Sequence, residues 1–291
     1  MATIDYAALK KGGFMRQKQK NKFSLRLQVT GGTLTADNLR TIAQVADRFG
    51  QEYVHLTSRQ GVEIPFVDAE DIDEVREVLA AGALSNGVCG PRVRTVTACQ
   101  GNTVCPSANI DSQDIAAKLA ARYYGRELPH KFKFGVTGCQ NNCLKAEEND
   151  LGIKGARVVD WDKTACITCG VCEKVCREGV IRTLEEGLAL DMDRCNACGR
   201  CVGACPADAW HGKPAYWVSF GGLFGNSINQ GETFLPVVQS EEQLFRITDA
   251  AIAFFADHAE AGERFNFTID RVGREAFKQQ MLNAWNGIPE G

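Results

Sequence analysis

Residues 98–105 read ACQGNTVC and residues 138–143 read GCQNNC, and these are the two most informative stretches of the chain. They contain two cysteine pairs, C-x5-C and C-x3-C, with 33 residues between the pairs. The four cysteines are Cys99, Cys105, Cys139 and Cys143. Cysteine is often buried as a small hydrophobic residue, so four inert thiols are one interpretation. A metal-cluster site assembled from two loops is the other.

A second group of cysteines forms an internal repeat. CITCGVCEKVC begins at residue 166 and CNACGRCVGAC begins 29 residues later, at residue 195. Each copy has the C-x2-C-x2-C-x3-C pattern of bacterial two-cluster ferredoxins, in which the fourth cysteine ligates the other cluster. The pattern predicts two 4Fe-4S clusters, one on Cys166, Cys169, Cys172 and Cys205, the other on Cys195, Cys198, Cys201 and Cys176. Structural zinc is the alternative, but zinc sites usually place a longer loop between C-x2-C pairs.

The overall composition limits the classes of protein that fit. The chain has 291 residues, 44% of them hydrophobic, and its longest apolar runs are far shorter than a membrane-spanning helix. We therefore expect no membrane span, and no export signal is visible. The formal net charge of -3 provides no general attraction to nucleic acid. Thirteen cysteines, an odd number, fit metal ligation in the reducing cytoplasm better than disulfides.

The residues before the first cysteine pair predict a small α+β unit. The expected elements are a strand over 23–30, a helix from Thr35 or Asp37 to Phe49, strands over 53–57 and 62–67, and a helix over 69–81. This β-α-β-β-α order predicts a ferredoxin-like sandwich, which is an α+β fold and not the iron-sulfur protein.

The rest of the chain predicts a larger unit that contains the cysteine repeat as an insertion. Helices are expected over 111–124, 241–258 and 272–285, and strands over 132–136 and 216–220. No low-complexity linker separates these blocks. The expected division is a ferredoxin-like domain at 1–88, a cluster-binding domain at 89–160 and 213–291, and an inserted two-cluster ferredoxin at 161–212.

The split cysteine set with its GCQNNC stretch resembles the cluster motif of the siroheme sulfite and nitrite reductases. Within that family the chain resembles the catalytic C subunit of the anaerobic sulfite reductases and, next to it, the small reductase-like modules of methanogens. The resemblance implies that the four cysteines hold a 4Fe-4S cluster and that Cys143 also bridges to the siroheme iron. Asn142, beside Cys143, is assigned to cofactor binding with it. A cluster next to a haem iron stores a further electron for a multi-electron reduction.

Four basic residues match the places where this family carries its anion-binding side chains. They are Arg59 in TSRQG, Arg94 in RVRTV, and Lys131 and Lys133 in KFK. Sulfite is a small dianion and needs several fixed cations. Strand positions two apart share a face, so Lys131 and Lys133 can reach one anion, and Arg92 and Arg94 share that property. The alternative is that these side chains simply face water.

A basic segment precedes them, with seven lysines and arginines and no acidic residue between Tyr6 and Ala36. Such a segment can attract nucleic acid or anionic lipid. Siroheme, however, carries many carboxylates that need cations. We therefore assign Arg26, with Lys20 or Lys22, to cofactor binding, and give Arg92 the same role.

The resemblance implies a siroheme-dependent, six-electron reduction of sulfite to sulfide. It also implies three 4Fe-4S clusters and electron-donating iron-sulfur or flavin subunits, or a ferredoxin, as partners. A siroheme nitrite reductase is the first alternative, because site chemistry and not fold decides the substrate. A non-catalytic electron-transfer subunit and a redox sensor are the others. Assimilatory relatives carry two copies of this unit and this chain carries one, so we expect two units to associate, the cations of one facing the siroheme of the other.

Overall fold

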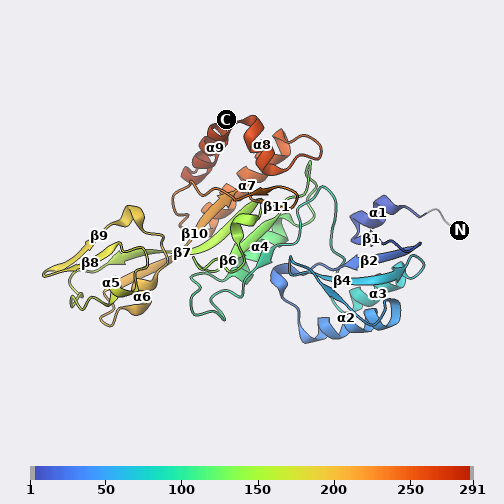
Figure 1. Cartoon of the computed structure of the whole chain (residues 1–291), viewed down its shortest axis with the longest axis horizontal. Helices are drawn as coiled ribbons and strands as arrows, with labels where there is room; N and C mark the ends of the chain where they lie inside the picture. The colour runs from blue at the N-terminus through green and yellow to red at the C-terminus, as the bar shows by residue number, and fades with distance from the viewer. Residues whose placement is uncertain (1–3, 289–291) are drawn as a thin grey trace.

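In the computed structural model, which describes residues 4–288, the chain forms three bodies in a row (Figure 1). An N-terminal domain lies at one end, a central domain with the C-terminal helices lies in the middle, and a cysteine-rich module, defined here as residues 162–209, lies at the other end. The few residues at each terminus of the expected division, 1–3 and 289–291, lie outside the described residues.

The N-terminal domain has a four-stranded antiparallel sheet in the order β1-β2-β4-β3. Its elements are α1 (Tyr6–Lys11), β1 (Phe14–Arg16), β2 (Lys22–Arg26), α2 (Ala36–Phe49), β3 (His55–Leu56), β4 (Val62–Asp68) and α3 (Ile72–Ala81). Thr35 begins α2 through a reciprocal capping box with Asn38. The expected β-α-β-β-α order is present, preceded by α1 and β1. The first strand ends at Arg26 and not at residue 30, because the chain turns into a short 3-10 helix at Thr30–Gly32.

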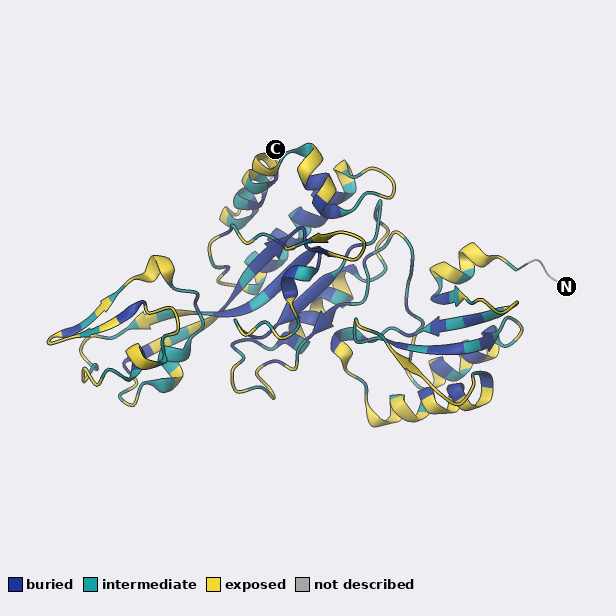
Figure 2. Cartoon of the chain, viewed as in Figure 1, coloured by how far each residue is buried: buried dark blue, intermediate teal, exposed yellow. Residues whose placement is uncertain are grey.

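The central domain is built on a sheet in the order β10-β7-β6-β5. Its strands are β5 (Thr97–Ala98), β6 (Phe134–Thr137), β7 (Leu151–Trp161) and β10 (Trp210–Phe220), of which the first three are parallel and β10 is antiparallel to β7. Its helices are α4 (Ser112–Tyr123), α7 (Glu241–His258), α8 (Phe265–Val272) and α9 (Arg274–Asn286). The sheet is largely buried (Figure 2), and Phe132 packs against Phe134, Phe255 and Phe265 beneath the helices.

Two parts of this domain differ from the sequence expectation. The expected helix over 272–285 is divided, because α8 ends at Val272 and Gly273, with a φ of 122°, precedes α9. The segment that follows β10, for which no strand is expected, forms a hairpin of β11 (Leu223–Phe224) and β12 (Ile228–Asn229). Among the described residues, no helix combines the length and apolar character needed to cross a bilayer.

The cysteine-rich module extends from the far end of the β7/β10 ladder. The two strands pair continuously from Leu151 with Phe220 to Trp161 with Trp210, and the module lies between their ends. It contains α5 (Val171–Val175), the hairpin of β8 (Ile181–Leu184) and β9 (Gly187–Leu190), and α6 (Arg200–Ala204). Cys172, Val180, Ile181 and Trp210 form its small core. The module is therefore held to the central domain by two adjacent strands.

Candidate functional site

A cavity of about 320 Å³ lies between the N-terminal and central domains, and its charged lining is entirely basic among the described residues. The N-terminal domain contributes Arg26 and Arg59, the latter from the turn between β3 and β4. The central domain contributes Arg94, before β5, and Lys131 and Lys133, before β6. The structure therefore brings together five cations that are far apart in the sequence. We call this the cation cavity.

The two lysines of the cation cavity have no counter-ion. Neither ammonium group makes a hydrogen bond or ion pair within the described part of the chain. Burial lowers the pKa of Lys133 to about 8, and repulsion from Arg59 and Arg264 contributes to the shift. Burial also lowers the pKa of Lys131. Partly buried amines without a carboxylate are suited to binding an anion that supplies the missing charge.

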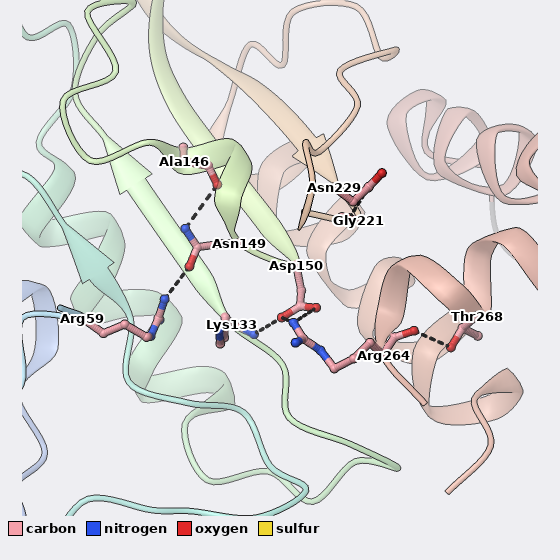
Figure 3. Close-up of polar contacts among 9 residues, drawn as sticks. All are labelled: Arg59, Lys133, Ala146, Asn149, Asp150, Gly221, Asn229, Arg264 and Thr268. Carbon is pink, nitrogen blue, oxygen red and sulfur yellow. Dashed lines mark hydrogen bonds and ion pairs between the residues drawn. The ribbon is translucent and has the colours of Figure 1, made fainter. Parts of the chain in front are cut away.

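Arg59 and Arg94 are held in place by oxygen acceptors of the central domain. The Arg59 guanidinium donates to Asn149 Oδ1 at 2.6 Å (Figure 3). It also donates to the Thr95 carbonyl at 3.0 Å. Burial lowers its pKa to about 10, so it remains charged at neutral pH. Arg94 donates to the Gly90 carbonyl at 2.9 Å, while its buried Nε has no partner among the described residues. Arg94 therefore lines the cavity with a guanidinium that no carboxylate neutralises among the described residues.

Asn149 and Asp150 organise the cavity wall, and sequence reasoning missed both. The fully buried Asp150 carboxylate accepts from Arg264 Nη2 at 2.8 and 3.0 Å and from the Lys133 backbone N–H at 2.9 Å (Figure 3). Asn149 orients Arg59, and Asp150 fixes the backbone that carries Lys133. The sequence offered one signal, a polar Asn-Asp pair that directly precedes a buried strand.

The cations assigned to cofactor binding have different surroundings. Arg26 reaches the cation cavity but is paired, donating to Glu63 Oε1 at 2.8 Å and to Cys89 Sγ at 3.3 Å. Arg92 does not line the cavity and pairs with the exposed Glu127 at 2.5 Å. Lys22 pairs with Asp68. Of the assigned cations, only Arg26 therefore lines the cation cavity.

The four cysteines of the split set lie at the opposite ends of the same strands. Cys99 directly follows β5, and Cys139 follows the neighbouring parallel β6 after one residue, Gly138. Burial raises the pKa of Cys99, but hydrogen bonds from Ser112, Gly101 and Gly138 outweigh it and lower the pKa overall. Burial, with repulsion from Cys105, Cys143 and Cys99, raises the pKa of Cys139. The four thiols are therefore close enough to interact, and Cys143 is exposed.

The loops around these thiols are tightly constrained. A Cβ on Gly138 would lie 2.7 Å from Ala108 Cβ, so only glycine lets the two cysteine loops approach so closely. Asn142 has a φ of 52°, and its Oδ1 accepts from the Ala146 backbone N–H at 2.9 Å. Its amide donates to Glu147. Asn142 thus shapes the turn that presents Cys143.

The split set supplies four thiols, the number of ligands that a 4Fe-4S cluster takes from a protein. Among the described residues, no group of three or more His, Cys, Asp or Glu side chains is arranged to hold one ion. A 4Fe-4S cube binds one thiolate at each iron, so its ligands surround it without converging on one point.

The cysteine-rich module has two small cavities with cysteine linings. One is lined by Cys166, Cys169, Cys172 and Cys205, and the other by Cys176, Cys195, Cys198 and Cys201. The structure thus brings together the two sets that the interleaved spacing predicts. The second set adjoins the central domain, since the Asn109 side chain donates to the Cys198 carbonyl at 3.2 Å.

The cation cavity and the split cysteines are separated along the sheet. Arg94 and Lys133 precede β5 and β6, whereas Cys99 and Cys139 follow them. A strand advances about 3.3 Å per residue, so β6, whose four residues lie between the two groups, is by itself roughly 13 Å long. One chain therefore presents its cations at the edge of the sheet where the parallel strands begin and its cysteines at the opposite edge, where these strands end. We call these two edges the cation edge and the cysteine edge.

Both large parts of the chain match known domains. Residues 89–288 match the nitrite and sulphite reductase 4Fe-4S domain, and residues 15–82 match the nitrite/sulfite reductase ferredoxin-like half domain. The chain belongs to the nitrite and sulfite reductase family. The resemblance carried by the cysteine motifs is confirmed.

Individual relatives agree with this family membership. The C subunit of the anaerobic sulfite reductase of Salmonella typhimurium is 32% identical over 96% of this chain and 89% of its own length. The coenzyme F420-dependent sulfite reductase of Methanocaldococcus jannaschii is 26% identical over 96% of this chain but only 44% of its own length.

Two solved structures share the mixed α/β fold. Dissimilatory sulfite reductase I has a TM-score of 0.70 at 20% identity, covering 89% of this chain and 69% of that one. The Mycobacterium tuberculosis NirA protein has a TM-score of 0.67 at 18% identity, covering 97% of this chain and 46% of that one.

Proposed function

We propose that this chain reduces sulfite to sulfide in a siroheme-dependent reaction. The cation cavity is the observation that carries the proposal, because its two unpaired lysines, beside the guanidinium groups of Arg59 and Arg94, suit a small oxyanion. The choice of sulfite is supported by the relatives named sulfite reductases, one of them over nearly the whole chain.

Each oxygen of sulfite leaves as water, so the six-electron reduction needs protons as well as electrons. Lys131 and Lys133 bind the sulfite oxygens, and their ammonium groups hold protons beside the oxygens that depart. Lys133, with a pKa of about 8, is the better donor near neutral pH. Arg59 and Arg94 stay charged and keep the anion in place as its oxygens are lost.

The split cysteine set is proposed to hold a 4Fe-4S cluster coupled to siroheme. Its ligands are Cys99, Cys105, Cys139 and Cys143, and the exposure of Cys143 leaves its thiolate accessible to a group outside the loop. When bound, siroheme supplies the iron at which sulfite is reduced. Arg26 is available for a siroheme carboxylate if its pair with Glu63 opens.

The module is proposed to be a two-cluster ferredoxin that relays electrons from a partner. The two cysteine-lined cavities support this role, with the Cys198 set nearest the split cysteines. An electron-donating iron-sulfur or flavin subunit, or a ferredoxin, is the expected donor. A reducing compartment, the cytoplasm, suits thirteen cysteines that are all free in the structure.

Two copies of the chain are proposed to complete each site. The cations and the cysteines of one chain lie at opposite edges of its sheet, so a siroheme anchored by one copy would face the cations of the other. The same arrangement is expected because this chain carries one copy of a unit that assimilatory relatives carry twice, so two chains are needed to supply both copies.

Optical and spin-resonance spectra of the purified protein, with iron and acid-labile sulfide counts, test the proposal. Siroheme absorption and three 4Fe-4S clusters are expected, together with steady-state reduction of sulfite. Faster turnover of nitrite than of sulfite would change the substrate. Two clusters without a porphyrin-like pigment would leave only an electron carrier.

A further inference from the structure

A second cavity, of about 520 Å³, lies where the cysteine-rich module meets the central domain. Its lining includes Cys139 of the split set and Cys198 of the second module set. Two side chains at this junction, Asn109 and Arg157, have environments that the proposed function does not yet explain.

Asn109 links the two cysteine loops through hydrogen bonds. It is buried, with 6% of its surface exposed. Its backbone N–H donates to the Gly138 carbonyl at 2.7 Å, and its side-chain Nδ2 donates to the Cys198 carbonyl at 3.2 Å. Gly138 is covalently bonded to Cys139. Two hydrogen bonds and a few covalent bonds therefore connect the backbone of Cys198 to that of Cys139.

Arg157 places an uncompensated positive charge beside the second module set. Its backbone N–H donates to the Ala197 carbonyl at 2.8 Å, and its side chain packs so closely on Gly199 that a Cβ there would lie 2.9 Å from it. Its Nε is buried without a hydrogen bond, and no carboxylate pairs with the guanidinium in the described part of the chain. The neighbouring Arg200, in contrast, donates to Asn141 Oδ1 at 3.3 Å.

We propose that Asn109 and Arg157 are positioning residues of an electron-transfer junction, an inference that rests on the proposed function. Asn109 couples the second module cluster to the split-set cluster. Arg157 raises the reduction potential of the module cluster, because a nearby positive charge stabilises the reduced form, which carries one more negative charge. One electron, supplied by the donor protein, reduces the module cluster and then passes to the split-set cluster, which is reduced as the module cluster is reoxidised.

The charge of Arg157 is tested on the holoenzyme by a redox titration monitored by spin resonance. The second-set cluster is identified by the signal that is lost in Cys198→Ser. In Arg157→Gln, the ratio of reduced to oxidised cluster at a fixed potential should fall about tenfold, which for a one-electron couple corresponds to about 59 mV. Arg157→Lys keeps the charge, and Arg40→Gln removes a charge from the distant helix α2, so both should titrate as the wild type does.

Asn109 is tested by the rate at which electrons reach the split-set cluster after rapid mixing with a reduced ferredoxin, which acts as the donor protein. Asn109→Leu keeps the size but removes the donor to Cys198, and it should slow this step about tenfold while leaving the module potential unchanged. An unaltered rate, or an Arg157→Gln titration that overlays the wild type, overturns the corresponding role. Equal loss of iron from Arg157→Gln and Arg157→Lys would show that Arg157 acts only through the packing of its side chain and not through its charge. A wild-type protein without three clusters would instead refute the proposed function.

Discussion

Lys133 is the single residue whose protonation controls the cation cavity most directly. Its ammonium group is half-buried, has basic neighbours, and is balanced only by the more distant charge of Asp150. The pKa is lowered to about 8, so Lys133 is charged below that pH and neutral above it. A bound anion favours the charged form and would draw the pKa back upward.

Anion affinity should therefore fall as the pH rises through 8. Between about pH 7 and about pH 9 the sulfate affinity should drop about fivefold to tenfold. This magnitude corresponds to the loss of one charge-assisted hydrogen bond, reduced because the site is partly solvated. Isothermal titration calorimetry measures the affinity, and sulfate is used because its charge stays the same over this pH range. Lys133→Arg stays charged and should keep only the smaller pH dependence that comes from Lys131. A flat wild-type profile would show that Lys133 does not contact the anion.

Asp150 should be among the most sensitive positions for folding. It is fully buried and paired with Arg264, and Asp150→Asn leaves that guanidinium without its counter-charge. Breaking a buried pair from one side costs about 3 to 5 kcal/mol, whereas an exposed pair contributes at most about 1 kcal/mol. Urea unfolding should show this difference between Asp150→Asn and Asp37→Asn, which breaks the exposed pair with Arg40. Similar losses for both variants would contradict it.

At the scale of elements, the N-terminal domain is attached to the edge strand of the central sheet by a side chain. Gln60, in the turn between β3 and β4, accepts from the Ala98 N–H at 2.9 Å and donates to the Ala98 carbonyl at 2.8 Å. The Gln60 amide thus takes the place of a neighbouring strand, which β5 lacks on this side. The contact is made at Ala98, one residue before Cys99. The contact also places Arg59, the preceding residue, in the cation cavity.

Gln60→Ala should destabilise the protein because both backbone groups of the buried Ala98 lose their partner. Leaving a buried donor and acceptor unsatisfied costs about 1 to 3 kcal/mol each. Urea unfolding followed by circular dichroism measures the loss. Gln51→Ala, an exposed site in the same domain, should change the free energy of unfolding by less than about 0.5 kcal/mol. If the two variants are equally stable, the amide does not hold the domains together.

The elements that could be predicted from sequence are those with regular apolar spacing. Helices α2 and α7 begin and end close to the expected residues. Strand β7 was not predicted, because Gly152 and Gly155 interrupt its apolar pattern. Both glycines are required by packing, since a Cβ on Gly155 would lie 2.2 Å from the Gly138 carbonyl oxygen. The first half of β10 was missed because it contains Pro214, which an edge strand tolerates.

The same limit applies to the candidate site. Spacing indicated the two cysteine sets of the module, because each motif is local in the sequence. The matching of Arg59, Arg94 and Lys133 rested on short motifs, whereas their supports come from segments with no such motif. Asp150 meets Arg264 across 114 residues, and Gln60 meets Ala98 across 38. Contacts of this kind depend on the tertiary fold, so single-sequence patterns do not reveal them.

At the scale of the whole molecule, the three bodies impose a direction on the proposed reaction. The module lies at one end of the molecule and the N-terminal domain at the other (Figure 1). On the module side, at the cysteine edge of the central sheet, Asn109 contacts Cys198. On the other side, the N-terminal domain contributes Arg26 and Arg59 to the cation cavity. In the proposed reaction, electrons would therefore arrive at one edge of the sheet and the anion would bind at the other. Two copies related by a two-fold axis would place each cysteine edge against the cation edge of its partner.

Mixing two inactive variants distinguishes shared sites from sites within one chain. Lys131→Ala disables the cation edge and Cys143→Ser the cysteine edge, so each homodimer should be inactive. In a mixed dimer with shared sites, one site carries both defects and the other carries neither. Random pairing makes half of the dimers mixed, so co-expression should restore about a quarter of the wild-type sulfite reduction. The control is a mixture of the two homodimers, purified separately and combined under conditions in which they do not exchange subunits. Activity no higher than in that control would place each complete site within a single chain, because no pairing could then restore it.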